Sequence, residues 1–122
     1  MARVKKVQQL LPQYGIDGLL IMSTYNRRYV TDFTGSAGAA LILSDSAYFI
    51  TDFRYVEQAK TETSGYDVVQ HNRSLIGEVA NIVNESQIGK LGFEQDHTAY
   101  STWEKLDHSI EAETVPVSNM VE

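Results

Sequence analysis

The apolar positions of the chain switch between helical and strand-like spacing. Over residues 2–11 they fall on one stripe of a helix, and Pro12, which lacks a backbone donor, predicts its end. A continuous apolar run at 19–22 predicts a strand buried on both faces. A short helix of polar and aromatic residues is expected over 25–31.

Two short apolar runs at 39–43 and 47–51 predict a β-hairpin, because only a Ser-Asp-Ser turn separates them. Polar and aromatic residues flank both of its ends, and functional groups concentrate in loops at strand ends. Segments 25–38 and 52–55 are therefore the candidate functional region.

The second half of the chain alternates helix and strand. Asp52 is placed to cap a helix over 53–63. There follow a strand at 66–70, a helix at 75–84 capped by Ser74, a strand at 89–94, a helix capped by Thr98 or Ser101 that runs through His108, and a strand at 113–117. Pro116 predicts that the last strand lies at a sheet edge. Trp103 is expected to be largely buried, since it lies on the same stripe of the last helix as aliphatic residues.

This alternation, interrupted by one hairpin, predicts an α/β domain with a mixed, mostly parallel sheet and helices on both faces. The 122 residues suit a single domain, and the chain has no cysteine and a net charge of −6. The charge argues against nucleic acid or an anionic membrane as partner. The apolar runs are far shorter than the ~20 residues that span a bilayer, so the expected location is cytoplasmic.

The sequence around the hairpin is specific. NRRYVTDFTGSAGAALIL, followed by AYFITDFRYVEQA, resembles the amino-terminal domain of Xaa-Pro aminopeptidases and dipeptidases, the creatinase/prolidase/aminopeptidase P family. The Gly-Ser-Ala-Gly element favours the aminopeptidase P branch of this family. The resemblance implies a six-stranded, ribonuclease H-like sheet and a single domain over 1–122. The family often has Gly where Asp32 and Phe53 stand, and Asp adopts a positive φ more readily than Phe.

Catalytic patterns are weak. His71, His97 and His108 lack metal-ligand spacing and are interpreted as surface histidines. Ser36 lies in a glycine-flanked loop, but Thr34 stands where a nucleophile elbow needs Gly, and the sequence offers no obvious base. A tight turn is the favoured interpretation, and a generic anion site in this loop stays open.

Recognition has better candidates. Asp52 and Arg54 either orient a ligand or serve as a helix cap and its structural partner. The cluster of Tyr25, Arg27, Arg28 and Tyr29 either grips a partner or forms a solvated helix face. The acidic side chains Glu94, Asp96, Glu104 and Asp107 are interpreted as surface charge. The candidates for a substrate entrance or subunit interface are Tyr25, Arg28, Tyr29, Phe33, Ser36, Asp52, Arg54 and Tyr55.

The resemblance implies that the chemistry lies elsewhere. In that family, a larger carboxy-terminal "pita-bread" domain holds two divalent metal ions, here expected to be manganese, cobalt or zinc. Its ligands, two Asp, one His and two Glu, match no residue of this chain, so no catalytic or metal-binding residue is assigned. The implied partners are that catalytic domain, a second copy in a homodimer, and the peptide substrate.

We therefore expect a non-catalytic amino-terminal domain of a proline-specific metallopeptidase, which supports oligomerisation and shapes the substrate entrance. One alternative is a free-standing module that binds a small anion with its Gly-rich loop. A complete small hydrolase is the third hypothesis.

The chain alone is predicted to release no amino-terminal residue from Xaa-Pro peptides, because it carries no metal-ligand or nucleophile pattern. The purified chain is incubated with such peptides and manganese, cobalt or zinc. Release above a blank, in a preparation free of host peptidases, contradicts the prediction.

Overall fold

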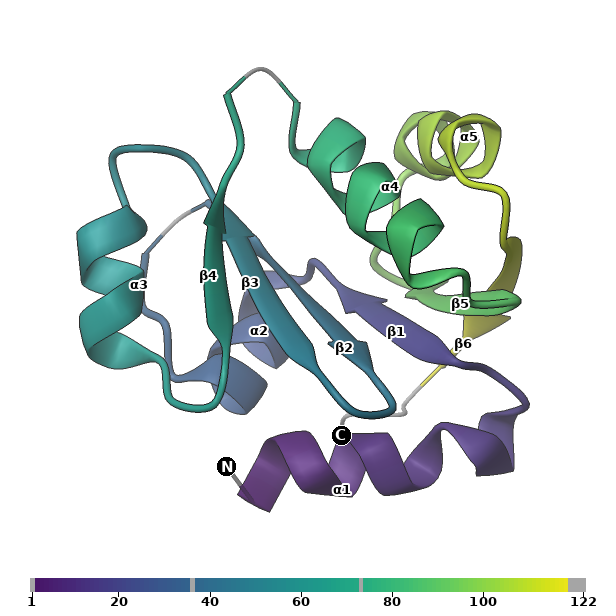
Figure 1. Cartoon of the computed structure of the whole chain (residues 1–122), viewed down its shortest axis with the longest axis horizontal. Helices are drawn as coiled ribbons and strands as arrows, with labels where there is room; N and C mark the ends of the chain where they lie inside the picture. Colours follow the sequence, from purple (N-terminus) through teal and green to yellow (C-terminus); the bar gives the residue numbers. More distant parts are fainter. Residues whose placement is uncertain (1, 36, 73, 119–122) are drawn as a thin grey trace.

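The computed structural model describes residues 2–35, 37–72 and 74–118 (Figure 1). Every predicted helix and strand is present. The helices are α1 (Ala2–Leu10), α2 (Thr24–Thr31), α3 (Val56–Glu62), α4 (Leu75–Ser86) and α5 (Tyr100–Ser109), with a 3-10 turn, η1 (Pro12–Tyr14), after α1. The strands are β1 (Gly18–Ile21), β2 (Ala39–Leu43), β3 (Ala47–Thr51), β4 (Asp67–Gln70), β5 (Lys90–Glu94) and β6 (Glu113–Val117).

The strands form one six-stranded sheet in the order β4-β3-β2-β1-β5-β6. β2 pairs antiparallel with both of its neighbours, and the pairs β1–β5, β3–β4 and β5–β6 are parallel. The predicted mixed, mostly parallel sheet is therefore confirmed, as is the edge position of β6. β1 is buried along its whole length, as its apolar run predicts.

Helices cover both faces of the sheet. On one face, α1 and α2 pack on β1 and β2, and Ala59 of α3 packs on the rings of Phe33 and Phe49. On the other face, α4 and α5 pack together over the centre of the sheet. Figure 1 shows α4 and α5 at the upper right and α1 on the opposite, lower side. The predicted helices on both faces are confirmed.

Two predicted helix starts are wrong. α3 begins at Val56, because the Asp52 carboxylate accepts hydrogen bonds from Arg54 instead of capping the helix. The intervening residues form a turn. α5 begins at Tyr100 after Ala99, which is extended and has no side-chain cap, so neither Thr98 nor Ser101 serves as the cap. The predicted cap of α4, Ser74, is confirmed by a 3.0 Å hydrogen bond from the Gly77 amide.

The backbone at Asp32 accounts for the glycine that the family resemblance leads us to expect at this position. Asp32 has φ 66° and ends α2 in the left-handed conformation, its amide donating to the Arg28 carbonyl at 2.8 Å. Asp tolerates this conformation, which glycine adopts without strain. Phe53 is not among the described residues with positive φ.

Two burial predictions need correction. Glu94 is buried, at 6% exposed, and so is not a surface charge. Trp103 is half-buried rather than largely buried, because its indole lies at the rim between Phe93 and Tyr100. Its Nε1 donates to Thr114 Oγ1 at 3.1 Å, which fastens α5 to β6. The deeper anchor of α5 is Leu106, at 1% exposed.

Trp103→Ala is predicted to lower the free energy of unfolding by roughly 1–3 kcal/mol, below the ~3–5 kcal/mol of a fully buried aromatic. Leu106→Ala, the matched variant on the same helix, should cost about 2–5 kcal/mol. Urea melts measure both. If Trp103→Ala leaves the free energy of unfolding unchanged, the indole does not hold α5 on β6.

Candidate functional site

The candidate segments meet at one edge of the sheet. β1, β3, β4, β5 and β6 run in the same direction, so their carboxyl ends share an edge, and β2 starts there. We call α2 and the loops at this edge the edge surface; it comprises the described residues within 22–38, 52–55, 71–74 and 94–99. Ala37, before β2, accepts a 2.8 Å hydrogen bond at its carbonyl from Thr51 Oγ1, at the end of β3. The structure thus brings segments 25–38 and 52–55 together.

A buried carboxylate fixes the start of α2. Glu94, the last residue of β5, accepts hydrogen bonds at Oε1 from the amides of Met22 and Ser23, at 2.8 and 3.0 Å. Its Oε2 accepts from Asn26 Nδ2 at 2.7 Å. Ser23 Oγ also accepts from the Asn26 amide at 3.3 Å, as a local helix cap. Anions are favoured at helix N-termini, so Glu94 ties β5 to the first turn of α2.

A buried guanidinium fixes the loop between Phe33 and Ala39. Arg27 is 3% exposed, and its Nη1 and Nη2 donate to the carbonyls of Gly38 and Gly35, both at 2.9 Å. Burial lowers the pKa of the Arg27 guanidinium from its usual value. Its carbon Cζ also lies 6.0 Å from the centre of the Phe33 ring, within cation–π range.

The outer side of the same loop binds α3. The amide of Thr34 donates to Glu62 Oε1 at 2.8 Å, and its hydroxyl contacts both oxygens of that carboxylate. Gln58 Nε2 donates to the Thr34 hydroxyl at 3.2 Å. The Thr34 amide is the largest cause of a lowered pKa of the Glu62 carboxyl, and the Gln58 side chain lowers it further.

The turn after β3 is held by an ion pair. Arg54 Nε and Nη2 donate to the two oxygens of Asp52 at 3.1 and 2.8 Å, and the Arg54 amide donates to Oδ1 at 3.0 Å. The Arg54 side chain, by hydrogen bonding, is the largest cause of a lowered pKa of the Asp52 carboxyl. Of the two interpretations of this pair, the structure favours the structural one, with Asp52 shaping a turn rather than capping a helix.

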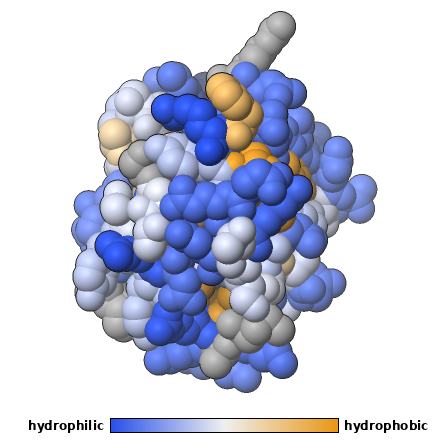
Figure 2. Space-filling view, turned by 90° about the vertical axis from the view of Figure 1, so that its left-hand side faces the viewer, coloured by the Kyte–Doolittle hydropathy of each residue, from blue (hydrophilic) through white to orange (hydrophobic). Residues whose placement is uncertain are grey.

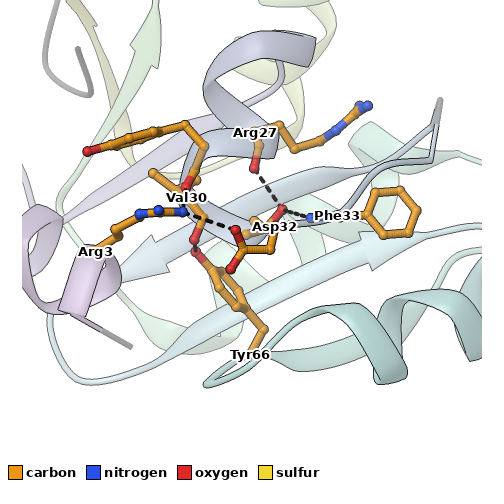
Figure 3. A network of polar contacts seen from close by, with 8 residues as sticks. Arg3, Arg27, Val30, Asp32, Phe33 and Tyr66 are labelled. Carbon is orange, nitrogen blue, oxygen red and sulfur yellow. Dashed lines mark hydrogen bonds and ion pairs between the residues drawn. The ribbon is translucent and has the colours of Figure 1, made fainter.

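The C-terminal end of α2 is hydrogen-bonded to Arg3 of α1 and to Tyr66, which precedes β4 (Figure 3). Arg3 Nη1 lies 3.0 Å from Asp32 Oδ1 and also donates to the Tyr29 carbonyl. The Tyr66 hydroxyl donates to the Val30 carbonyl at 2.9 Å, and burial raises the pKa of Tyr66 well above its usual range. In Figure 3 the Arg27 side chain extends away from Asp32. Arg27 therefore binds the loop at Gly35 and Gly38, whereas Asp32 binds Arg3.

The structure separates the predicted site residues into surface and support. Tyr25 is 78% exposed, and Arg28, Tyr29 and Arg54 are exposed as well. Asp52 and Tyr55 are half-buried, with Tyr55 edge-on to the Phe33 ring at 5.9 Å. Phe33 is fully buried, so it supports the loop from beneath and cannot contact a partner in this conformation. Ser36 lies outside the described residues.

Two charged residues of this edge have a different place from the one predicted. Arg27 was expected to grip a partner or face solvent and Glu94 to be surface charge, but both are buried anchors. Phe53, which lies in segment 52–55 but was not among the individual candidates, is 74% exposed in the ion-paired turn. A signal for Phe53 was available, since it directly follows Asp52 at the end of an apolar strand. Figure 2 shows the side that carries α3 and β4, where polar side chains predominate and apolar ones gather in small, separate areas.

Within the described part of the chain, no group of three or more His, Cys, Asp and Glu side chains could hold a metal ion. No helix there is long and apolar enough to cross a membrane. The donors of Thr34 in the Gly-rich loop already bind the carboxylate of Glu62. An external anion would have to displace that side chain, which weighs against the anion-binding alternative.

The fold and the edge surface define an α/β domain that presents aromatic and cationic side chains on α2 and on the turn after β3. The chain belongs to the Creatinase/Prolidase N-terminal domain family, whose profile matches residues 3–122.

Its relatives include peptidases. It is 48% identical over 121 residues to the "Uncharacterized peptidase YqhT" of Bacillus subtilis (strain 168), covering 98% of this chain. The structure of a Xaa-Pro dipeptidase from Bacillus anthracis matches 100% of this chain with a TM-score of 0.97 and 46% identity. The N-terminal domain of the cytoplasmic peptidase PepQ from Mycobacterium tuberculosis H37Rv matches with a TM-score of 0.90 and 31% identity.

The two Bacillus relatives are much longer than this chain, which spans 34% of each. The PepQ structure is instead an N-terminal domain by itself, of which this chain covers 95%. The similarity is therefore confined to one domain of the longer proteins.

The contact between Thr34 and Glu62 is predicted to weaken in acid. Because the folded pKa of Glu62 is lowered, its stabilising contribution is complete above the unfolded value of about 4.3 and is lost as pH falls through the folded pKa. An NMR titration from about pH 6 to 3 follows the Glu62 carboxyl and the Thr34 amide together. Glu62→Gln should abolish the pH response of that amide, and a response that persists in Glu62→Gln contradicts the assignment.

Proposed function

We propose that this chain is the amino-terminal domain of a longer Xaa-Pro peptidase, in which its edge surface meets a partner subunit and narrows the substrate entrance. Family membership and the peptidase relatives support the class of enzyme. In this proposal a carboxy-terminal catalytic domain of the same protein holds two divalent metal ions, manganese, cobalt or zinc, and cleaves the bond. The assembly is a cytoplasmic homodimer.

The observation that carries the proposal is the composition of the edge surface. Tyr25 and Phe53 are exposed at 78% and 74%; the exposed cation Arg28 lies with Tyr25 on α2, and the exposed Arg54 lies with Phe53 in the turn after β3. Aromatic and arginine side chains are enriched in protein interfaces, because they supply large contact areas and several donors. The start of α2 is hydrogen-bonded to the buried Glu94, and the turn after β3 is hydrogen-bonded to Asp52, so little order is lost on binding.

The substrate explains why a narrowed entrance is useful. A proline residue lacks a backbone donor and restricts the residue before it, so the bond before proline offers few groups for recognition. A site that accepts only the first residues of a peptide needs limits on its depth and width. Loops of a neighbouring subunit can provide those limits.

In the longer protein, Arg28→Ala and Phe53→Ala are predicted to change KM for Xaa-Pro peptides by roughly 3- to 10-fold, equivalent to about 0.6–1.4 kcal/mol, while kcat is retained. The reason is that both side chains are exposed at the edge surface and remote from the chemical step. Steady-state kinetics with peptides of increasing length measure the effect.

Tyr14→Ala and Lys105→Ala are the matched controls. Tyr14 lies in η1, which precedes β1 at the opposite edge of the sheet, and Lys105 is exposed on α5. Both should leave KM and the molecular mass in solution unchanged. The proposal fails if Arg28→Ala and Phe53→Ala change neither peptide preference nor assembly, or if they act only by lowering the melting temperature.

A further inference from the structure

Arg27 and Arg28 are adjacent in sequence but have opposite environments. Arg28 is exposed, whereas Arg27 is 3% exposed and its Nε has no hydrogen-bond partner. No ion pair to Arg27 is found among the described residues, where the ion pairs are Arg3–Asp32 and Arg54–Asp52. A buried cation is unfavourable unless hydrogen bonds replace its water. The two carbonyl oxygens that Arg27 binds are therefore essential to its placement.

Those two carbonyls belong to one loop. Nη1 binds Gly38 and Nη2 binds Gly35, so the planar fork of Arg27 spans the loop from its entry to its exit. A lysine ammonium is a single point of charge and could not hold both carbonyls in this geometry. The contact thus depends on the shape of the guanidinium as well as on its charge.

The two glycines let the loop lie flat on the rings beneath it. Gly38 has φ 149°, and a Cβ there would lie 2.6 Å from Phe49 Cζ. A Cβ on Gly35 would overlap the ring of Phe33 and lie 3.0 Å from Tyr55 Cδ1. The loop therefore packs directly against Tyr55, which ends the turn that carries Phe53.

We propose that Arg27 is a positioning residue for the edge surface: it fixes the loop backbone at Gly35 and Gly38 from below, and thereby sets the geometry that a partner subunit meets. The inference rests on the proposed function for its biological use. It adds that assembly and peptide preference depend on a side chain that touches neither partner nor substrate.

The first experiment uses the chain itself, with 15N relaxation of the amides of Gly35, Ala37 and Gly38. In Arg27→Met their order parameters should fall from about 0.85 to below about 0.6, while the amides of β2 stay rigid. Val30→Ala is the matched control, because it opens a space on the same helix without touching the loop contacts. Equal loop order in Arg27→Met and Val30→Ala, at similar melting temperatures, overturns the proposal.

Chemical rescue separates a missing guanidinium from general damage. Methylguanidinium at millimolar concentration should restore loop order in Arg27→Ala and have no effect on Val30→Ala. Arg27→Lys, which keeps the charge, should leave one end of the loop ordered and the other end mobile. If Arg27→Lys orders both ends as the parent chain does, the bidentate contact has no positioning role and the inference fails.

The second experiment uses the longer protein and distinguishes this inference from the proposed function. Arg27→Lys should raise KM and lower the dimer fraction with kcat retained, the same direction of effect as is predicted for Arg28→Ala. If Arg28→Ala and Phe53→Ala alter KM but Arg27→Lys does not, the positioning role is overturned and the proposed function stands. If all three variants leave KM and assembly unchanged, the proposed function itself is overturned, and the use proposed for Arg27 with it.

Discussion

The edge surface depends on hydrogen bonds to two buried charges, Glu94 at the end of β5 and Arg27 on α2. Removing a charged group from water costs several kcal/mol, and this cost is recovered only when its hydrogen bonds are made inside the protein. The Glu94 carboxylate is matched by the amides of Met22 and Ser23, and the Arg27 guanidinium by two loop carbonyls. Neither charge can lie elsewhere without losing these partners. The two charges therefore fix α2 relative to the segment before it, at Met22 and Ser23, and to the loop after it, at Gly35 and Gly38.

The fold was predictable because its signals are local. The hairpin strands have the predicted bounds, since apolar runs and a turn triplet define them within thirteen consecutive residues at 39–51. The cap of α4 was predictable for the same reason. The start of α3 was not, because Asp52 has two local partners to choose from, the helix amides or Arg54. A bidentate charged contact is stronger than a cap, and the choice is invisible in a residue pattern.

The candidate site was predictable as a pair of segments but not as a set of side chains. A polar helix offers no apolar stripe to say which arginine points inward, so Arg27 and Arg28 look alike in sequence. Glu94 resembles any charged residue at a strand end, because the groups that bury it lie 68–72 residues earlier in the chain. Phe33 was placed on the surface by proximity to the loop, whereas its ring is the floor on which that loop rests.

The two caps of α2 have a consequence for a chain that emerges from the ribosome in order. Ser23 Oγ is three residues from the amide that it caps, so this cap forms as soon as the helix is made. Glu94 is synthesised much later, and closing a loop of that length carries an entropic cost that only the docked sheet offsets. Until Glu94 is made, Ser23 is the one of these two caps that is available to the first turn of α2. Because of this order of synthesis, the Ser23 cap is available when α2 first forms, and the Glu94 cap is added only when the sheet is complete.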